Sequence, residues 1–189
     1  MHTKSFLDAL NAHPPADAEE AEHLRNMRHF VAAHADTWWQ RSTAPGHVTG
    51  SAWVLNAARS HALLLHHKKL NLWVQPGGHL DPTDKSPAMG ALREALEETG
   101  IATLQLAQPA IFDVDIHPIP ARVRSALGGI DEPAHLHFDV RYLVIAGDNR
   151  FTLSGESLGA KWHLLADLAA PAHERSIARM AEKSTRLDL

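Results

Sequence analysis

Residues 75–101 read QPGGHLDPTDKSPAMGALREALEETGI and form the most informative stretch of this 189-residue chain. The pattern predicts a Pro-Gly-Gly turn followed by a helix. Ser86 and Pro87 favour the start of that helix, because a serine side chain can cap the N-terminus and a proline fits the first helical position. Gly100 favours its end, since glycine readily adopts the left-handed conformation that closes many helices.

Three carboxylates share one side of the predicted helix. Glu94 and Glu98 are one turn apart, and Glu97 lies about 60° from Glu94 around the axis. Like charges at this spacing repel, and a hard divalent cation such as Mg²⁺ would remove the repulsion by taking carboxylate oxygens. Arg93 precedes Glu97 by four residues and can hold it by an ion pair. The alternative is a solvated acidic helix face.

This stretch resembles the Nudix box, whose pattern is G-x5-E-x7-R-E-U-x-E-E-x-G-U, with U a bulky apolar residue. Residues 93–101, REALEETGI, match its second half, although Ala95 is small for its U position. The first half departs from the pattern, because Asp84 stands where the first Glu belongs and one extra residue separates it from Arg93. The resemblance implies an α/β fold of the Nudix type, an α/β/α sandwich with a mixed β-sheet.

The resemblance also implies a chemistry. Nudix hydrolases use Mg²⁺ or Mn²⁺ to cleave a nucleoside diphosphate linked to another moiety, so the expected partner is a small-molecule diphosphate such as a nucleotide, ADP-ribose or a sugar nucleotide. Glu97 and Glu98 would be the chief metal ligands, Glu94 a ligand or proton acceptor, and Arg93 the orienting residue. A backbone carbonyl of the glycine pair, such as that of Gly78, would complete the metal shell. Family members are often homodimers, and the oligomeric state is left open here.

Composition narrows the classes of function. The net charge is −4 and no arm is rich in Lys or Arg, which disfavours a nucleic-acid partner. The chain has no cysteine, which excludes disulfides, thiolate metal sites and cysteine nucleophiles. It lacks a signal pattern and any apolar run approaching the length of a membrane span, so we expect a cytoplasmic protein without a membrane partner.

Residues 1–46 are predicted to form an N-terminal helical extension, and residues 47–189 the Nudix domain. A short first helix is broken by Pro14 and Pro15, and Asp17 with Glu20 resembles a capping box. The next helix carries an apolar stripe at helical spacing: Ala21, Leu24, Met27, Phe30 and Val31. We interpret the stripe as a packing surface against the main domain or a second subunit, and a lid over the site is the alternative.

Strands are predicted at residues 47–56, 62–69 and 72–74, before the glycine turn, and two more follow the helix. Residues 111–117, IFDVDIH, and 135–142, HLHFDVRY, each alternate apolar side chains with titratable ones. One interpretation is that these titratable groups pair across the ladder. The other is that some of them line the substrate cleft, with this candidate set: His79, His117, His135, His137 and Arg141.

Two further segments bear on the site. Residues 118–134 contain three prolines and a glycine pair, which predicts a loop too long for a simple hairpin. Glu156 precedes the last predicted strand, at a position where Nudix hydrolases often carry an acidic residue. It would act there as an additional acid/base or metal ligand, and a solvated turn is the alternative.

Three other functions compete with hydrolysis. A Nudix-fold module that binds a nucleotide ligand with little or no turnover would account for Asp84 and the extra residue. Isopentenyl diphosphate isomerase shares the fold, but its chemistry uses a cysteine that this chain lacks. RNA cap hydrolysis is disfavoured by the acidic charge balance.

Overall fold

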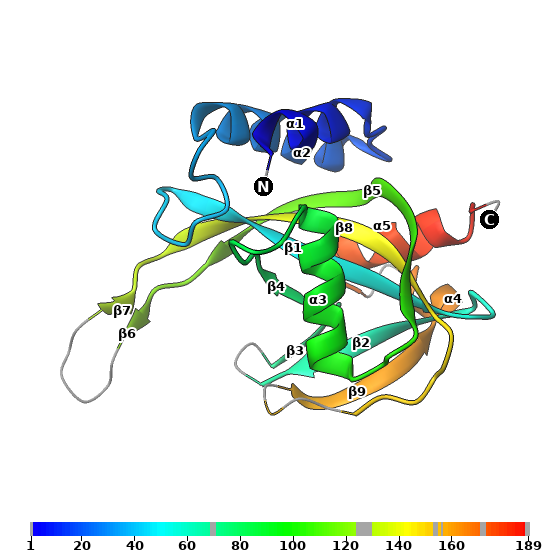
Figure 1. Cartoon of the computed structure of the whole chain (residues 1–189). Coiled ribbons are helices and arrows are strands. Elements are labelled where there is room, and N and C mark those ends of the chain that lie inside the picture. The colour runs from blue at the N-terminus through cyan, green and yellow to red at the C-terminus, as the bar shows by residue number, and fades with distance from the viewer. Residues whose placement is uncertain are drawn as a thin grey trace.

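The structure is a computed structural model that describes residues 2–68, 71–123, 130–152, 155, 157–170 and 173–187. Two helices precede the first strands, one helix lies between two groups of strands, and two helices end the chain (Figure 1). The helices are α1 Thr3–Ala12, α2 Ala18–Ala33, α3 Pro87–Thr99, α4 Leu165–Leu168 and α5 Arg175–Ser184. The strands are β1 Gly46–Asn56, β2 His61–His67, β3 Leu72–Val74, β4 Gly77–His79, β5 Leu104–Ile119, β6 Arg122–Val123, β7 Ile130–Glu132, β8 His135–Ala146 and β9 Ser157–Leu164.

Seven of these strands form one mixed sheet. The neighbours run in the order β3, β2, β1, β8 and β5, while β4 also pairs with β1 and β9 with β2. β1 and β8 run parallel over their full length, and the other pairs are antiparallel. β1 is buried from end to end, as expected for a strand covered on both faces. The predicted mixed sheet between helices is therefore confirmed.

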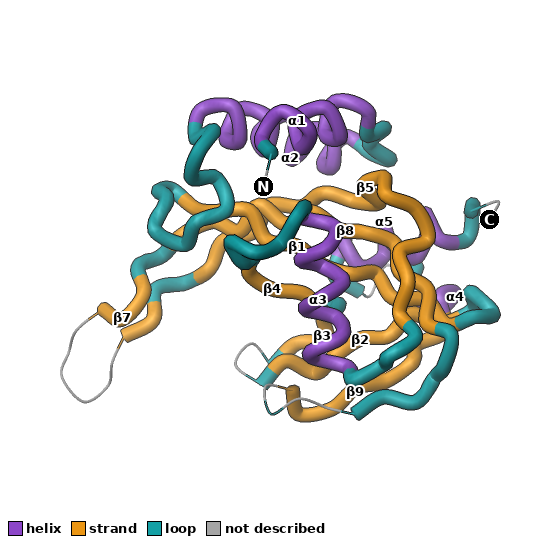
Figure 2. The backbone as a smooth tube through the Cα atoms, viewed as in Figure 1, coloured by secondary structure: helices purple, strands orange, loops and turns teal. Residues whose placement is uncertain are grey.

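Helices lie on both sides of this sheet, with α3 in front and α5 behind in the view of Figure 2. On one face α3 approaches the backbone of β1 so closely that a Cβ at Gly50 would lie 3.0 Å from the carbonyl oxygen of Pro87. On the other face the indole of Trp53 in β1 donates a hydrogen bond to Ser184 in α5, at 2.8 Å. Ile177, Met180 and Ala181 complete the apolar contact of α5 with this face.

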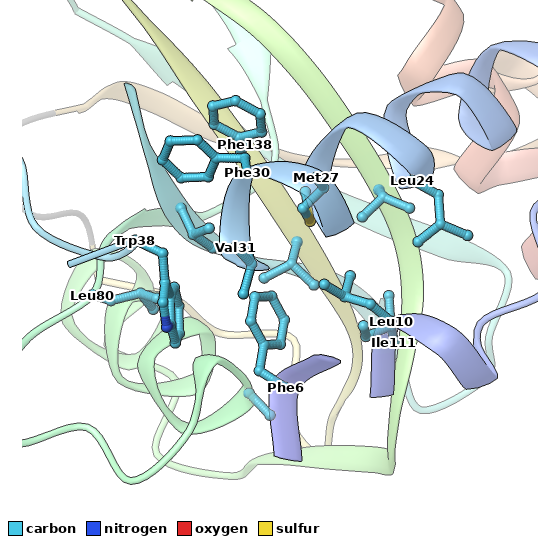
Figure 3. Packing of buried hydrophobic residues seen from close by; sticks show 14 of the residues in the cluster. Phe6, Leu10, Leu24, Met27, Phe30, Val31, Trp38, Leu80, Ile111 and Phe138 are labelled. Atoms are coloured by element: carbon cyan, nitrogen blue, oxygen red, sulfur yellow. The ribbon is translucent and has the colours of Figure 1, made fainter. Parts of the chain in front are cut away.

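The N-terminal helices lie together against the edge of the sheet formed by β5, and they share one apolar cluster with it (Figures 1 and 3). The phenyl ring of Phe30 in α2 stacks on that of Phe138 in β8 with centroids 4.1 Å apart. Phe6 of α1 stacks on Trp38 at 4.8 Å. Leu24, Met27, Phe30 and Val31 are all buried, so the predicted stripe packs against the sheet of its own chain.

Polar side chains of α2 also accept hydrogen bonds from backbone N–H groups on the unpaired edge of β5. The backbone N–H of Val114 donates to Glu20 at 3.2 Å, and that of Ile116 donates to His23 at 3.3 Å. An uncovered strand edge invites pairing with another chain, so this contact protects β5. Asp17 caps α2 by accepting the N–H of Glu20, as the capping box predicted.

The segment 118–134 differs from the prediction. Instead of a loop throughout, it contains the antiparallel pair β6 and β7, in which Arg122 faces Glu132. This pair prolongs β5 and β8 into an arm that extends away from the body of the molecule (Figure 1). Residues 124–129 lie outside the described residues. None of the helices in the described part of the chain combines enough length with enough apolar character to span a bilayer.

Candidate active site

Helix α3 has the ends that the sequence predicted. The side chain of Ser86 accepts the N–H of Met89, Pro87 occupies the first turn, and Gly100 is left-handed with φ of 63°. Ala88, Ala91 and Ala95 are buried against the sheet. These small residues let the helix axis approach β1, and the opposite arc, which carries the glutamates, faces β4 and solvent.

The glycine pair in β4 contacts two of these glutamates. The backbone N–H of Gly77 donates to Oε2 of Glu98 at 2.9 Å. Gly78 lies against Glu94 so closely that a Cβ there would be 2.7 Å from the carboxyl carbon and from Oε2. Only a residue without a Cβ fits this gap without displacing Glu94. The predicted approach of a glycine backbone to the acidic helix is therefore present.

Arg93 connects the remaining parts of the site. Its guanidinium donates to both carboxylate oxygens of Asp84, at 3.1 and 3.0 Å, and to the backbone carbonyl of His79 at 3.0 Å. Nη1 also lies 2.9 Å from Glu94 and 3.2 Å from Glu97. One arginine thus fixes two of the three helix carboxylates relative to β4.

Asp84, which stands where the Nudix pattern has its first Glu, has a structural role in the site. Its carboxylate is buried, grips Arg93 in a bidentate fashion and accepts the N–H of Asp81 at 2.7 Å. Gly90 makes room for it, since a Cβ on Gly90 would lie 2.8 Å from Asp84 Oδ2. The shorter acid at position 84 therefore holds the orienting arginine.

The electrostatics of the helix face suit a cation. Burial raises the pKa of Glu94, and the charges of Glu97 and Asp84 raise it further, while Arg93 partly offsets the shift. Hydrogen bonds to Asp84 raise the pKa of Arg93, so its charge is fixed. Glu97 keeps a side chain that is 61% exposed. Buried and exposed carboxylate oxygens beside a glycine backbone form a donor set that fits Mg²⁺ or Mn²⁺, and the ligands would be Glu94, Glu97 and Glu98.

Arg141 does not lie free in a cleft. Its side chain is 3% exposed, and its guanidinium donates to Asp139 at 2.8 Å and to Asp113 and Asp115 at 3.1 Å each. Arg179 of α5 also pairs with Asp113, at 2.9 Å. The geometry favours the alternative in which charges pair across the ladder, against the prediction that Arg141 lines a substrate cleft.

The predicted histidines gather on one face of the sheet, on the side of β4 away from the glutamates. His79, His135 and His137 surround His47, with ring centroids 4.9 to 5.1 Å from it. His117 lies at the border of the group, 5.5 Å from the His137 ring, and contacts Asp115 at 3.1 Å. Burial lowers the pKa of His47 and of His79 to about 4, and that of His137 to about 2.

The sequence analysis missed His47 and the polar residues that follow it in β1. Thr49 and Ser51 both donate to Asp139, at 3.0 and 2.8 Å, and Gln75 donates to the same carboxylate at 3.2 Å. The signal was the alternation of His47, Thr49 and Ser51, which places all three side chains on one face of the strand. Glu156, the candidate additional acid/base, lies outside the described residues.

A comparison with protein-family models identifies residues 45–183 as a NUDIX domain. The chain belongs to the NUDIX domain family. The match covers the glycine pair, the acidic helix and the whole sheet, which agrees with the resemblance seen at residues 75–101. A comparison with curated proteins finds no match.

Solved structures show the same fold at low sequence identity. A NUDIX-family hydrolase from Clostridium perfringens is 23% identical with a TM-score of 0.52, over 75% of this chain and 98% of that one. The binary complex of a C. elegans Ap4A hydrolase is 20% identical with a TM-score of 0.51, over 74% and 95%. The NUDIX domain of Shewanella oneidensis NrtR, cocrystallised with ADP ribose, is 19% identical with a TM-score of 0.50, over 82% and 96%.

Proposed function

We propose that this NUDIX protein hydrolyses a phosphoanhydride bond in a nucleoside diphosphate linked to another moiety, with Mg²⁺ or Mn²⁺ as cofactor. The observation that carries the proposal is the contact of Glu94 and Glu98 with the Gly77–Gly78 backbone, braced by Arg93. Family membership and the similarity to Nudix-fold hydrolases support it. We also propose that the protein acts in the cytoplasm, with residues 1–46 as an extension packed on the catalytic domain.

The proposed reaction adds water across a P–O–P bridge. The water oxygen forms a bond to one phosphorus, the bridging P–O bond breaks, and the leaving phosphate oxygen keeps the electron pair. When bound to the glutamates, Mg²⁺ or Mn²⁺ would supply positive charge against the phosphate oxygens and acidify the attacking water. Glu97 and Glu98 would be the chief ligands, Glu94 a ligand or the proton acceptor, and the carbonyl of Gly78 would complete the set.

Glu94 is the residue best placed to accept the proton of the attacking water. Burial raises its pKa above the ordinary value of 4.5, and a raised pKa makes a carboxylate a stronger base. Arg93 keeps the carboxylate oriented through a 2.9 Å hydrogen bond, and its link to His79 fixes β4 at the same time. Glu156 is the alternative base, as the sequence resemblance implies.

The substrate class rests on comparison. The neighbours include an Ap4A hydrolase and a domain bound to ADP ribose, so dinucleoside polyphosphates and ADP-ribose come first in a panel, followed by sugar nucleotides and nucleoside triphosphates. Purified protein is incubated with each compound and Mg²⁺ or Mn²⁺, and released phosphate or nucleotide is measured. Product from at least one compound, lost on adding a chelator, is expected. Tight binding of a compound without product under any divalent metal would support the binding-module alternative instead.

A further inference from the structure

Three histidines from three strands meet on the face of the sheet away from α3. His47 in β1 pairs in register with His137 in the parallel strand β8, and His79 reaches them from β4, where it pairs with Thr49. The ring centroids of the three histidines are 4.9 to 5.3 Å apart. One ring nitrogen from each lies within 4.8 Å of those from the other two.

The nitrogens of this cluster lack hydrogen-bond partners. His47 is 0% exposed, and neither of its ring nitrogens has a partner among the described residues. The buried Nε2 atoms of His79 and His137 are likewise without a partner in the part of the chain that the structure describes. Native proteins pair nearly all buried polar atoms, and an exception often marks the place of an ion. The ring of His79 stacks on that of His47, while the ring of His137 is inclined to them by 89° and 62°, and the three rings place ring nitrogens close enough for one ion to bind them.

We propose that His47, His79 and His137 bind a transition-metal ion of the Zn²⁺ class, at a site separate from the glutamates of α3. Neutral imidazole nitrogens suit Zn²⁺, Ni²⁺ or Cu²⁺, whereas Mg²⁺ and Ca²⁺ take oxygen ligands. Zn–N bonds of about 2.0 Å place tetrahedral ligand atoms roughly 3.3 Å apart. The nitrogens lie up to 4.8 Å apart, so binding requires each pair to approach by up to about 1.5 Å.

His135 borders the cluster, with its ring centroid 5.1 Å from those of His47 and His137, and it would have to move closer to serve as a fourth ligand. Its Nδ1 lies 2.9 Å from the carbonyl oxygen of Pro133, so that nitrogen carries the proton and Nε2 keeps its lone pair. A second hydrogen bond of this kind commonly orients a metal-ligating histidine. The Nε2 atom has no hydrogen-bond partner among the described residues, and Glu132 Oε1 lies 4.0 Å from it. His135 also lines a pocket of about 410 Å³ with Pro45, Pro118 and Leu136 beside the cluster.

The proposed ion would fix the strand that carries the glycine pair. The backbone carbonyl of His79 accepts a hydrogen bond from Arg93, and Gly78 beside it contacts Glu94. A metal on the His79 side chain therefore ties β4 to β1 and β8 while the other side of β4 contacts the acidic helix. The site is a positioning device for β4 and stands whether or not the protein hydrolyses a diphosphate.

The test uses full-length protein without a histidine tag. Zn²⁺ content is measured after gel filtration by atomic emission, and the dissociation constant by competition with a chromophoric chelator. Co²⁺ replaces Zn²⁺ as a spectroscopic probe, because a tetrahedral nitrogen site gives intense visible d–d bands. We expect one Zn²⁺ per chain and a tetrahedral Co²⁺ spectrum. Failure to bind either metal, or an octahedral Co²⁺ spectrum, would overturn the proposal.

Variants locate the ion. His79→Asn and His137→Asn should each weaken Zn²⁺ binding by more than the 10- to 100-fold typical of losing an outer-shell partner. His163→Asn is the matched control, because His163 also has a buried Nε2 without a partner among the described residues but lies outside the cluster. The double variant Glu97→Gln, Glu98→Gln should bind Zn²⁺ as the wild type does. Unchanged affinity in both histidine variants, or loss in the glutamine variant, would refute the site.

Discussion

Substituting Gly78 by alanine tests whether the glycine backbone positions the catalytic carboxylates. A Cβ at this position would lie 2.7 Å from the carboxyl group of Glu94, against about 3.4 Å for ordinary van der Waals contact. Either β4 or Glu94 must therefore move by about 0.7 Å. A misplacement of about 1 Å at a reacting group can lower a rate by about 100-fold, so we expect kcat to fall by about 10- to 100-fold, or about 1.4 to 2.7 kcal/mol in activation free energy.

The assay for Gly78→Ala is product release from whichever diphosphate the panel identifies, at saturating Mg²⁺, together with a thermal melt. Gly155→Ala is the matched control, because a Cβ on Gly155 would meet no atom of the described residues within 4 Å. The melting temperature of both variants should stay near that of the wild type. Full activity in Gly78→Ala, or an equal loss in Gly155→Ala, would show that the close approach does not position Glu94.

Three further substitutions probe the support of the site and of the sheet. Arg93→Lys keeps the charge but cannot bridge several carboxylates, so kcat should fall at least about 10-fold with an unchanged melting temperature; a silent variant would contradict the orienting role. Phe30→Ala removes the stack on the sheet and should lower the free energy of unfolding by about 3 to 5 kcal/mol in urea titrations, and a loss below about 1 kcal/mol would contradict that packing. Burial alone would raise the pKa of Glu20, but hydrogen bonds from His13 and Lys183 hold that pKa well below its ordinary value of 4.5. The contribution of Glu20 to the free energy of unfolding is therefore complete above pH 4.5 and is lost as the pH falls below 4.5. At pH 7 the free energy of unfolding of Glu20→Gln should therefore be about 1 to 3 kcal/mol below that of the wild type. This difference should become smaller toward pH 3, and a difference that does not change with pH would contradict the role given to the Glu20 carboxylate.

Local rules predicted the parts of the fold that depend on neighbours in sequence. Ser86 and Gly100 set the ends of α3 because capping and left-handed closure are decided within a few residues. The contact of Gly78 with Glu94 could also be anticipated from the glycine pair upstream of the acidic helix, although this pair forms strand β4 and not the predicted turn. These features need no knowledge of strand order.

Contacts that depend on register could not be predicted from the sequence. The alternation in residues 111–117 and 135–142 showed which side chains share a face, but not that Asp113 would lie opposite Arg141. A register shift between Ile111 and Asp113 decides that pairing, and it has no sequence signature. The same limitation concealed the histidine cluster, because His47 joins it only through the parallel pairing of β1 with β8.

The central claim is that the carboxylates of α3 carry out metal-dependent hydrolysis, and the double variant Glu97→Gln, Glu98→Gln tests it most directly. Glutamine keeps the size and shape of each side chain while removing the charge that holds the cation. Initial rates are measured with Mg²⁺ and Mn²⁺ on the diphosphate that the wild type cleaves, alongside a thermal melt. The account predicts a folded protein whose kcat is reduced by at least about 1000-fold, about 4 kcal/mol. A folded double variant that retains full activity would contradict it.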